Sequence, residues 1–395
     1  MSSETSLSKR IKRHVIGRMR PYFAATAPGA EPLCRRELSA LALSVQDSTV
    51  VRGGVEFKGI LQDCYLANLH LRTANRILMR IHDFRASGFN QFESKTAEIP
   101  WELYLPPGSS PQIHATTRHC RLYHTGAISE RLLKSISQHT GSQTDKREQN
   151  EGLLWKQKIF VRGVDDHFTI SIDSSGQHLH KRGLKIHPGQ APLRETIAAA
   201  ALLLAGCSGT EPVLDPMCGT GTFSLESALM AKNIPPGWFR EFAFMRWPSF
   251  RPKKWEYLKR QCRPRFTEHR TPTIFASDKD PSACRRLEKG LIENRLADVV
   301  KVINQDFFDL CPGALTDRKG LVAINPPYGK RLENRIKSEQ LFIKICARLG
   351  QEYRGWKVIL ISPHRHLLNK VPFRLEAHPI FHGGLRPMLM IGTIA

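Results

Sequence analysis

The chain has 395 residues, of which 41% are hydrophobic and 8% aromatic, so it is long enough for two or three domains with cores of their own and is not a disordered chain. Its 59 Lys and Arg residues outnumber its 36 Asp and Glu residues and give a formal net charge of +23. This surplus favours a polyanionic partner, because each cation that meets a phosphate releases condensed counterions. With no long apolar run and no apolar signal sequence, we expect neither membrane insertion nor export.

The nine cysteines are scattered, and no two of them form a Cys-x-x-Cys pair. This pattern gives no support to a zinc ribbon or a thioredoxin-like motif, and an odd number of thiols suits a reducing, cytoplasmic location. His178, His180 and His187 lie close together in the sequence. Without a supporting Cys or Asp pattern, we interpret them as linker or RNA-contacting residues and expect no metal site.

The first half of the chain predicts a basic arm followed by a small α+β unit. Residues 1–20 hold six basic residues and one glutamate, which is typical of a disordered arm, either a solvated tail or a segment that adds phosphate contacts. Beyond it, strands and helices are mixed up to about Gly176, as in an α+β unit. We expect strands at 22–26, 53–59 and 111–119, helices at 29–41, 63–81 and 124–140, and a hairpin at 158–176 that turns at Asp165 and Asp166.

After residue 190 the predicted strands alternate with helices, as a doubly wound parallel sheet requires. An insertion at 233–270 interrupts this pattern and carries Trp238, Trp247 and Trp255 among many basic residues. The expected strands are 212–215, 273–277, 299–303, 321–325 and 357–362, the expected helices are 223–231, 281–296 and 338–350, and segments 373–381 and 389–395 form a closing hairpin.

A glycine-containing loop follows the first of these strands. The strand ends at Asp215, and Gly219 and Gly221 make a tight turn into the next helix. Glycines at this point let the backbone approach a ligand closely, at the sheet edge where open α/β folds bind ligands. The third glycine of the dinucleotide fingerprint is missing, which disfavours a nicotinamide cofactor. A purely structural turn is the alternative.

Two further strands also end in carboxylates. Asp278 is placed to accept hydrogen bonds from both hydroxyls of a ribose, whereas Asp280, followed by Pro281, is expected to be a helix N-cap. Asp306 follows the third strand and could accept from an adenine amine, or it could be a surface aspartate.

The most specific signal is the sequence Asn325, Pro326, Pro327, Tyr328 at the end of the fourth strand. The prolines restrict the backbone and so fix the position of Asn325. Its side-chain oxygen and the Pro326 carbonyl could each accept one N–H of a planar amino group, which would turn the nitrogen lone pair toward an electrophilic methyl group. Tyr328 offers a face on which a base could stack.

These motifs resemble those of class I amino-methyltransferases. Several stretches are similar to one branch, the THUMP-domain guanine-N2 methyltransferases of bacterial 23S rRNA, and the resemblance runs from about Pro21 to the C-terminus. Some members carry a second methyltransferase domain, and this sequence stops without one. Residues 1–20 also lie outside the match. The similar stretches are 22–38, 53–59, 69–81, 171–203 and 380–385.

The resemblance implies a ferredoxin-like segment at 21–62, a THUMP RNA-binding domain at 63–175 and a Rossmann-like methyltransferase domain at 176–395, after the tail 1–20. It implies S-adenosylmethionine as the cofactor and ribosomal RNA, 23S rRNA or its precursor, as the partner. Asn325 to Tyr328 would hold the guanine amine. Arg194 and Glu195 would lie against the methionine end of the cofactor. The other cofactor-binding residues would be Asp215, Pro216, Cys218, Gly219, Thr220, Gly221, Asp278 and Asp306.

We therefore predict a methyltransferase that acts on the N2 amine of a guanine in 23S rRNA, after the base has left its stack. The insertion would add phosphate contacts, and Trp247 and Trp255 would either stack on RNA or pack in the core. The alternatives are methylation of a tRNA guanine, of DNA adenine or cytosine, or of a protein glutamine, and an RNA-binding assembly factor with a vestigial fold. We expect a monomer or weak oligomer.

Overall fold

The structure is a computed structural model that describes residues 2–44, 47–141, 156–184, 193–327, 332–362, 365–379 and 388–395. The chain divides into two compact units. Unit 1 comprises Met1–Thr26, Cys34–Leu179 and Glu241–Arg260, and unit 2 comprises Ala27–Leu33, His180–Arg240 and Gln261–Ala395. The segment Glu241–Arg260, which we expected within the domain 176–395, therefore belongs to unit 1. Within the described ranges, no helix is both long enough and apolar enough to cross a membrane.

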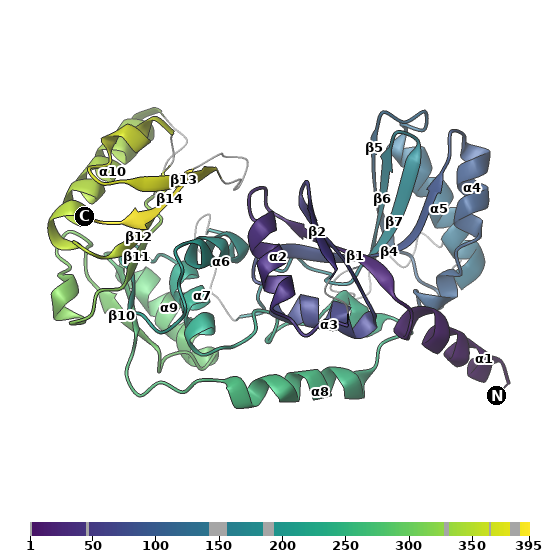
Figure 1. Cartoon of the computed structure of the whole chain (residues 1–395), viewed down its shortest axis with the longest axis horizontal. Helices are drawn as coiled ribbons and strands as arrows, with labels where there is room; N and C mark the ends of the chain where they lie inside the picture. The colour runs from purple at the N-terminus through teal and green to yellow at the C-terminus, as the bar shows by residue number, and fades with distance from the viewer. Residues whose placement is uncertain are drawn as a thin grey trace. The chain divides into compact units, whose positions relative to one another are not determined.

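The described residues of unit 1 form a seven-stranded sheet in the order β2-β3-β1-β4-β7-β6-β5 (Figure 1). All neighbours are antiparallel except β5 and β6. The strands are β1 (Arg20–Thr26), β2 (Ser48–Val51), β3 (Gly54–Gly59), β4 (Ala74–Arg85), β5 (Gln112–Arg118), β6 (Lys158–Val164) and β7 (His167–Asp173). The helices are α1 (Ser2–Ile11), α2 (Glu31–Ser39, whose first turn belongs to unit 2), α3 (Leu61–His70), α4 (Phe89–Ala97) and α5 (Thr125–Thr140).

The predicted hairpin of unit 1 is confirmed. Strands β6 and β7 pair antiparallel, and the turn between them places Asp165 and Asp166 at φ +51° and +61°. Aspartate tolerates this left-handed conformation better than most residues, because its short polar side chain can hydrogen-bond locally. The turn signal in the sequence was therefore sufficient to locate the hairpin.

The prediction of one long helix over 63–81 is wrong. Helix α3 ends at His70, and the chain continues as β4. The Glu37 carboxylate accepts hydrogen bonds from the backbone N–H groups of Arg72 and Thr73, at 2.8 and 3.0 Å. In a longer helix these N–H groups would instead donate to backbone carbonyls four residues earlier. Beyond this break Ile77, Met79 and Ile81 are buried at every second position, which is the period of a strand.

The prediction of a disordered arm over 1–20 is also wrong. Helix α1 and a π-helical turn at Lys12–Ile16 cover most of it. Ile11 and Val15, four residues apart on one helical face, are buried, and the Arg10 guanidinium lies 2.7 Å from the Glu102 carboxylate. The prediction of disorder was based on the many basic residues of this segment and did not take into account the two apolar residues that pack against unit 1.

The insertion at 233–270 contains α8 (Pro252–Cys262), and its tryptophans are packed rather than exposed. Trp247 and Trp255 are each 4% exposed, so the expectation that they stack on RNA is replaced by its alternative, core packing. The Trp247 indole donates to the Gln157 side chain at 2.9 Å, and Trp255 meets the Tyr65 and Phe244 rings edge-on.

The described residues of unit 2 form a second seven-stranded sheet, in the order β10-β9-β8-β11-β12-β14-β13. Neighbouring strands are parallel from β10 to β12, and β14 and β13 add an antiparallel edge, so the predicted doubly wound sheet with a closing hairpin is confirmed. The strands are β8 (Val213–Asp215), β9 (Ile274–Asp278), β10 (Val300–Asn304), β11 (Leu321–Ile324), β12 (Lys357–Ser362), β13 (Leu375–Pro379) and β14 (Met388–Thr393). The helices are α6 (Glu195–Leu204), α7 (Thr222–Ala231), α9 (Pro281–Glu293) and α10 (Leu332–Glu352).

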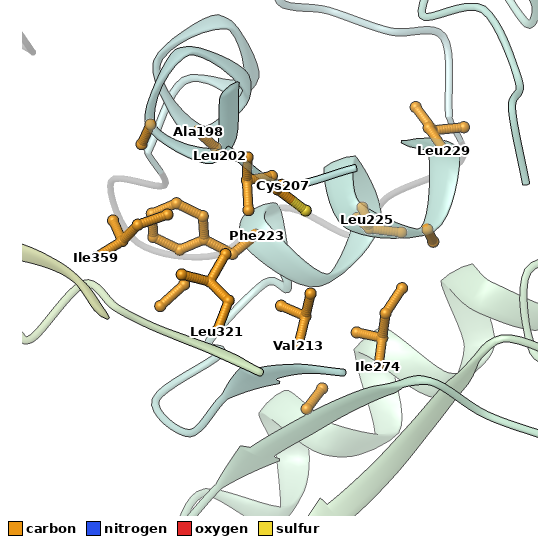
Figure 2. Packing of buried hydrophobic residues seen from close by; sticks show 14 of the residues in the cluster. Ala198, Leu202, Cys207, Val213, Phe223, Leu225, Leu229, Ile274, Leu321 and Ile359 are labelled. Atoms are coloured by element: carbon orange, nitrogen blue, oxygen red, sulfur yellow. The ribbon is translucent and has the colours of Figure 1, made fainter. Parts of the chain in front are cut away.

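One face of this sheet is covered by α6 and α7. Figure 2 shows Leu202 of α6 and Phe223 of α7 above Val213 and Leu321 of the strands, with Ile359 beside Phe223, and all five residues are buried in one cluster. Each fully buried side chain of this kind stabilises the fold by about 1.5–3 kcal/mol relative to exposure. This core holds α7 and the end of β8 in a fixed relation, on which the adjacent site depends.

Candidate active site

The polar residues predicted at strand ends meet at one cavity of unit 2, with a volume of about 790 Å³. Asp215 and Asp278 are the last residues of β8 and β9, Asp306 lies two residues after β10, and Asn325 follows β11. The chain runs from β8 outward to β9 and β10 and then returns to the other side of β8 as β11. The cavity lies at this switch point, where open α/β sheets bind ligands.

The glycine loop shapes one wall of the cavity. Gly219 and Gly221 have φ values of +52° and +77°, which glycine adopts at little cost. Gly219 lines the cavity, and a Cβ built on it would meet open space among the described residues. Gly221 is not among the lining residues; it is the N-cap of α7, where a Cβ would overlap the Leu287 side chain. The two predicted cofactor glycines therefore differ, because one faces the cavity and the other faces the core.

Asp215 is 2% exposed and links the loop to α7. One of its oxygens accepts from the Ser224 backbone N–H at 3.0 Å and from the Ser224 hydroxyl at 2.6 Å. Burial raises the pKa of the Asp215 carboxyl to about 7, the charge of Asp278 acts in the same direction, and the two bonds from Ser224 oppose them. The neighbouring predicted residues Pro216, Cys218 and Thr220 also line the cavity.

Asp278 lies across the cavity edge from the loop. One carboxylate oxygen accepts from the Gly219 N–H at 2.9 Å and the other from the Asp280 N–H at 2.9 Å. Each carboxylate oxygen has two acceptor positions, so Asp278 can still accept from a ligand. Asp280 caps α9, since its side chain accepts from the Ser282 N–H at 2.8 Å, as the sequence predicted. One oxygen of Asp306 accepts from the Phe308 N–H at 3.0 Å.

Asn325 supplies an unusual acceptor. Its side-chain oxygen is buried and has no hydrogen-bond partner among the residues that the structure describes. A buried carbonyl oxygen without a partner costs free energy unless a ligand satisfies it. Pro326 and Pro327 line the same cavity, whereas the predicted Tyr328 lies outside the described residues.

Arg194 and Glu195 stand beside the cavity and are not among the residues that line it. Leu193 lines it instead, and the Thr222 hydroxyl donates to the Leu193 carbonyl at 3.3 Å. Arg194 is exposed and is the N-cap of α6. Burial raises the pKa of Glu195 to about 7, with a further rise from Glu226.

Several residues at the cavity carry no motif that the sequence reasoning used. Phe308 contributes a half-buried aromatic side chain to the cavity. Its position two residues after Asp306, a carboxylate near a strand end, is a sequence signal that could have identified it. Arg286 donates to the Ser282 hydroxyl at 3.0 Å. The lining residues not singled out from the sequence are Leu193, Met217, Thr222, Phe223, Lys279, Ser282, Ala283, Arg286, Phe307, Phe308 and Leu341.

Within the described ranges of the chain, no group of three or more His, Cys, Asp or Glu side chains is placed to hold a metal ion. Of the three clustered histidines, His178 and His180 are described, and His187 lies outside the described residues, as does the family-like stretch 380–385.

Two family models match the chain. The model for an RMKL-like methyltransferase domain matches residues 182–375, which include the whole cavity wall from β8 to β11. The model for an RlmL ferredoxin-like domain matches residues 21–78, which extends beyond the segment 21–62 expected from the sequence.

Curated relatives match nearly the whole chain. "Putative RNA methyltransferase slr0064" of Synechocystis is 30% identical over 93% of this chain and 94% of its own length. The ribosomal RNA large subunit methyltransferase K/L of Methylococcus capsulatus is 31% identical over 95% of this chain and 51% of its own length. The chain thus spans about half the length of that K/L relative.

Solved structures match nearly the whole chain. The structure of SMU.472 in complex with S-adenosylhomocysteine has a TM-score of 0.82 and 26% identity, and covers 96% of this chain and 99% of its own. A structure from Listeria monocytogenes, described as that of a "predicted N6-adenine-specific DNA methylase", has a TM-score of 0.82 and 28% identity, and covers 95% of this chain and 96% of its own.

Proposed function

Because the chain belongs to the family of RMKL-like methyltransferases, we propose that it methylates the exocyclic N2 amine of a guanine in 23S ribosomal RNA. The coarser activity is that of an RNA methyltransferase with S-adenosylmethionine as its cofactor. The finer proposal concerns the base, the amine and the RNA. It rests on Asn325 and its neighbours at the edge of the sheet.

The cavity fits the cofactor in its charge and shape. Asp278 would accept from the ribose hydroxyls, and Gly219 leaves space where any larger residue would intrude. Asp306 would accept from the adenine amine, beside the aromatic ring of Phe308. When bound, S-adenosylmethionine supplies an electrophilic methyl group, which becomes attached to the amine nitrogen as its bond to sulfur breaks.

The single observation that carries the proposal is the buried side-chain oxygen of Asn325 in the same cavity, which has no hydrogen-bond partner among the described residues. We infer that it accepts one N–H of the target amine and that the Pro326 carbonyl accepts the other. Two fixed acceptors hold the amino group in one orientation and stabilise the positive charge that develops on its nitrogen. The surplus proton then leaves to water.

RNA as the substrate is supported by charge and by domain organisation. The net charge of +23 favours a polyanion, and an RNA-binding unit of the THUMP type at 63–175 would position it. The amine of a stacked, paired guanine is inaccessible to such a cavity, so we expect the target in a loop, a bulge or precursor RNA.

The deciding experiment is transfer of a radiolabelled methyl group to undermodified ribosomal RNA, followed by nucleoside analysis. At saturating cofactor, Asn325→Ala should lower the rate at least about 100-fold, in line with the loss of one preorganised hydrogen-bonding group. The same variant should bind S-adenosylhomocysteine as the wild type does, because Asp278 and the glycine loop are unchanged. Asp278→Ala is the matched comparison, because it should weaken the binding of S-adenosylhomocysteine, which Asn325→Ala leaves unchanged.

Each outcome decides a different part of the proposal. Label in N2-methylguanosine that disappears in Asn325→Ala supports the reaction, the base and the residue together. Label in N6-methyladenosine, or in tRNA or DNA rather than ribosomal RNA, would leave the amine chemistry standing and overturn the substrate. Cofactor binding without labelling of any nucleic acid would favour a protein substrate or an assembly factor.

A further inference from the structure

Helix α8 has two faces of different character. Trp255 and Leu258 are buried, and the Trp255 ring packs against Tyr65, Phe242 and Phe244 at centroid distances of 6.2, 5.7 and 5.4 Å. The backbone just before the helix is also tied to this cluster, since the Arg251 N–H donates to the Tyr65 hydroxyl at 3.4 Å. The inner face is therefore fixed in the interior of unit 1.

The outer face is basic and carries one exposed aromatic ring. Lys253, Tyr257 and Arg260 follow at steps of four and three residues, which places them on one side of a helix, opposite Trp255 and Leu258. Tyr257 is 46% exposed, and both cations are exposed. A tyrosine exposed to this extent among cations contrasts with the buried tryptophans of the same insertion.

The cations on this face are not neutralised within the described part of unit 1. Lys253, Lys254 and Arg260 make no ion pair there, although Glu256 lies four residues before Arg260 on the same helix. The Lys254 ammonium lies 5.0 Å from the centre of the Tyr257 ring, a cation–π contact that orients the ring. The surface thus offers free positive charge next to an oriented aromatic ring.

We propose that the outer face of α8, formed by Lys253, Lys254, Tyr257 and Arg260, binds a single-stranded segment of the substrate RNA. From Lys253 to Arg260 the helix rises about 10 Å, which matches about three phosphates at the ~3.4 Å spacing of stacked nucleotides along one strand. The cations contact these phosphates, and a base stacks on Tyr257. This inference rests on the proposed RNA substrate and names the surface that holds it.

An anionic membrane would fit the same charges but not the rest of the helix. Amphipathic helices bind bilayers by inserting an apolar face. The apolar face of α8 is occupied by the aromatic cluster of unit 1, so only the polar face is accessible. Vesicles of anionic phospholipid therefore serve as a control in the test.

The test measures binding of a fluorescein-labelled single-stranded RNA to the full-length protein by anisotropy over a range of KCl concentrations. In the triple variant Lys253→Ala, Lys254→Ala, Arg260→Ala, the slope of log Kd against log salt should fall by about 2, since three phosphate contacts on a single strand contribute about 0.7 each. An unchanged slope in this variant would overturn the proposal.

A matched control removes the same charge elsewhere. Lys289, Lys301 and Lys344 are exposed cations on α9, β10 and α10 of unit 2. Their triple replacement by alanine should leave the salt slope close to that of the wild type. If both triple variants lose the same affinity, net charge rather than α8 binds the RNA, and the proposal fails.

The aromatic part of the surface is tested separately. Tyr257→Ala should weaken binding about tenfold, whereas Tyr257→Phe, which keeps the ring, should bind nearly as the wild type does. Circular dichroism checks that both variants are folded, which the exposure of the side chain predicts. Equal affinities of Tyr257→Ala and wild type would remove stacking from the proposal.

The wild-type protein separates this inference from the proposed function. If it neither binds nor methylates RNA, the proposed function itself fails. If it methylates RNA while the α8 triple variant does so with unchanged KM and kcat, only the inference about α8 fails. Binding of wild type to anionic vesicles, lost in the triple variant and without RNA binding, would assign the surface to a membrane.

Discussion

The two sheets that the structure describes use their strand ends differently. In unit 2 the strands from β10 to β12 are parallel, so their carboxyl ends meet at one edge, and Asp215, Asp278 and Asn325 reach one cavity. In unit 1 all strand pairs but one are antiparallel, and successive strand ends lie at opposite edges. The parallel topology of unit 2 brings polar strand ends together at one edge, whereas the antiparallel pairing in unit 1 distributes its strand ends over two edges.

Both units contain a buried ion pair between an arginine and a carboxylate, but the two pairs connect different structural elements. Arg76 and Asp173 connect β4 and β7 inside unit 1. Arg182 holds Glu226 of α7 through two hydrogen bonds, of 2.7 and 3.2 Å, with both side chains 1% exposed. Only the second pair acts on the helix that the glycine loop enters, so we expect it to influence ligand binding as well as stability.

The largest effect should come from breaking either pair. Arg182→Ala and Arg76→Ala should each lower the free energy of unfolding by about 3–5 kcal/mol, because each leaves a buried carboxylate without the arginine that pairs with it. Denaturant unfolding measures this loss. Titration with S-adenosylhomocysteine should then separate the two, with weaker binding in Arg182→Ala and unchanged binding in Arg76→Ala among the molecules that remain folded.

A double replacement shows whether charge or packing matters at this position. Arg182→Met with Glu226→Leu removes both charges and keeps most of the volume, so it should recover much of the stability lost in Arg182→Ala. If Arg76→Ala weakened cofactor binding as much as Arg182→Ala does, the contrast between the two units would not hold.

A smaller effect, on pH dependence, is expected at Asp215. Its pKa is raised by burial to about 7, whereas in the unfolded chain it ionises near its ordinary value of 3.8. Between these values the unfolded state loses the proton first, so stability falls as the pH rises from about 4 to about 7. Asp215→Asn keeps an acceptor for Ser224 and cannot ionise.

Comparing the wild type with Asp215→Asn separates the effect of the Asp215 carboxyl on stability from the effects of other groups with raised pKa values. Between pH 5 and pH 8 the wild type should lose about 3 kcal/mol of unfolding free energy relative to Asp215→Asn. Thermal or urea unfolding across this range provides the measurement. Parallel stability curves for the two proteins would mean that Asp215 is ionised in the fold at pH 5, and hence that its burial does not govern its charge.

These contrasts also explain what the sequence could predict. The strands of unit 2 and the polar residues near their ends were predictable, because the apolar runs of β8 and β11 lead directly into Asp215 and Asn325. The break between α3 and β4 was not, since it depends on Glu37, which is 36 residues before Thr73 in the sequence. Long-range hydrogen bonds of this kind leave no local pattern.

The candidate site was predictable in its residues and less so in their orientation. The G-x-G spacing treats both glycines alike, and only the position of Leu287 on α9 shows that Gly221 faces the core. Likewise, the composition of the insertion indicated aromatic and basic residues together. It could not show that Trp255 packs inward while Tyr257 remains exposed, because that depends on where the aromatic partners from unit 1 lie.

The smallest effect on stability is expected at the two glycines, where it distinguishes a residue that faces the cavity from one that faces the core of unit 2. Alanine at either position adopts a left-handed conformation at a cost of about 1–2 kcal/mol. Gly221→Ala must also displace Leu287, so it should destabilise the protein more in urea, with only a small change in affinity for S-adenosylhomocysteine. Gly219→Ala should do the reverse, because its methyl group projects into space that the ligand needs. Equal effects of both variants on ligand affinity would show that the loop responds as one unit, and that facing the cavity or the core makes no difference at these two positions.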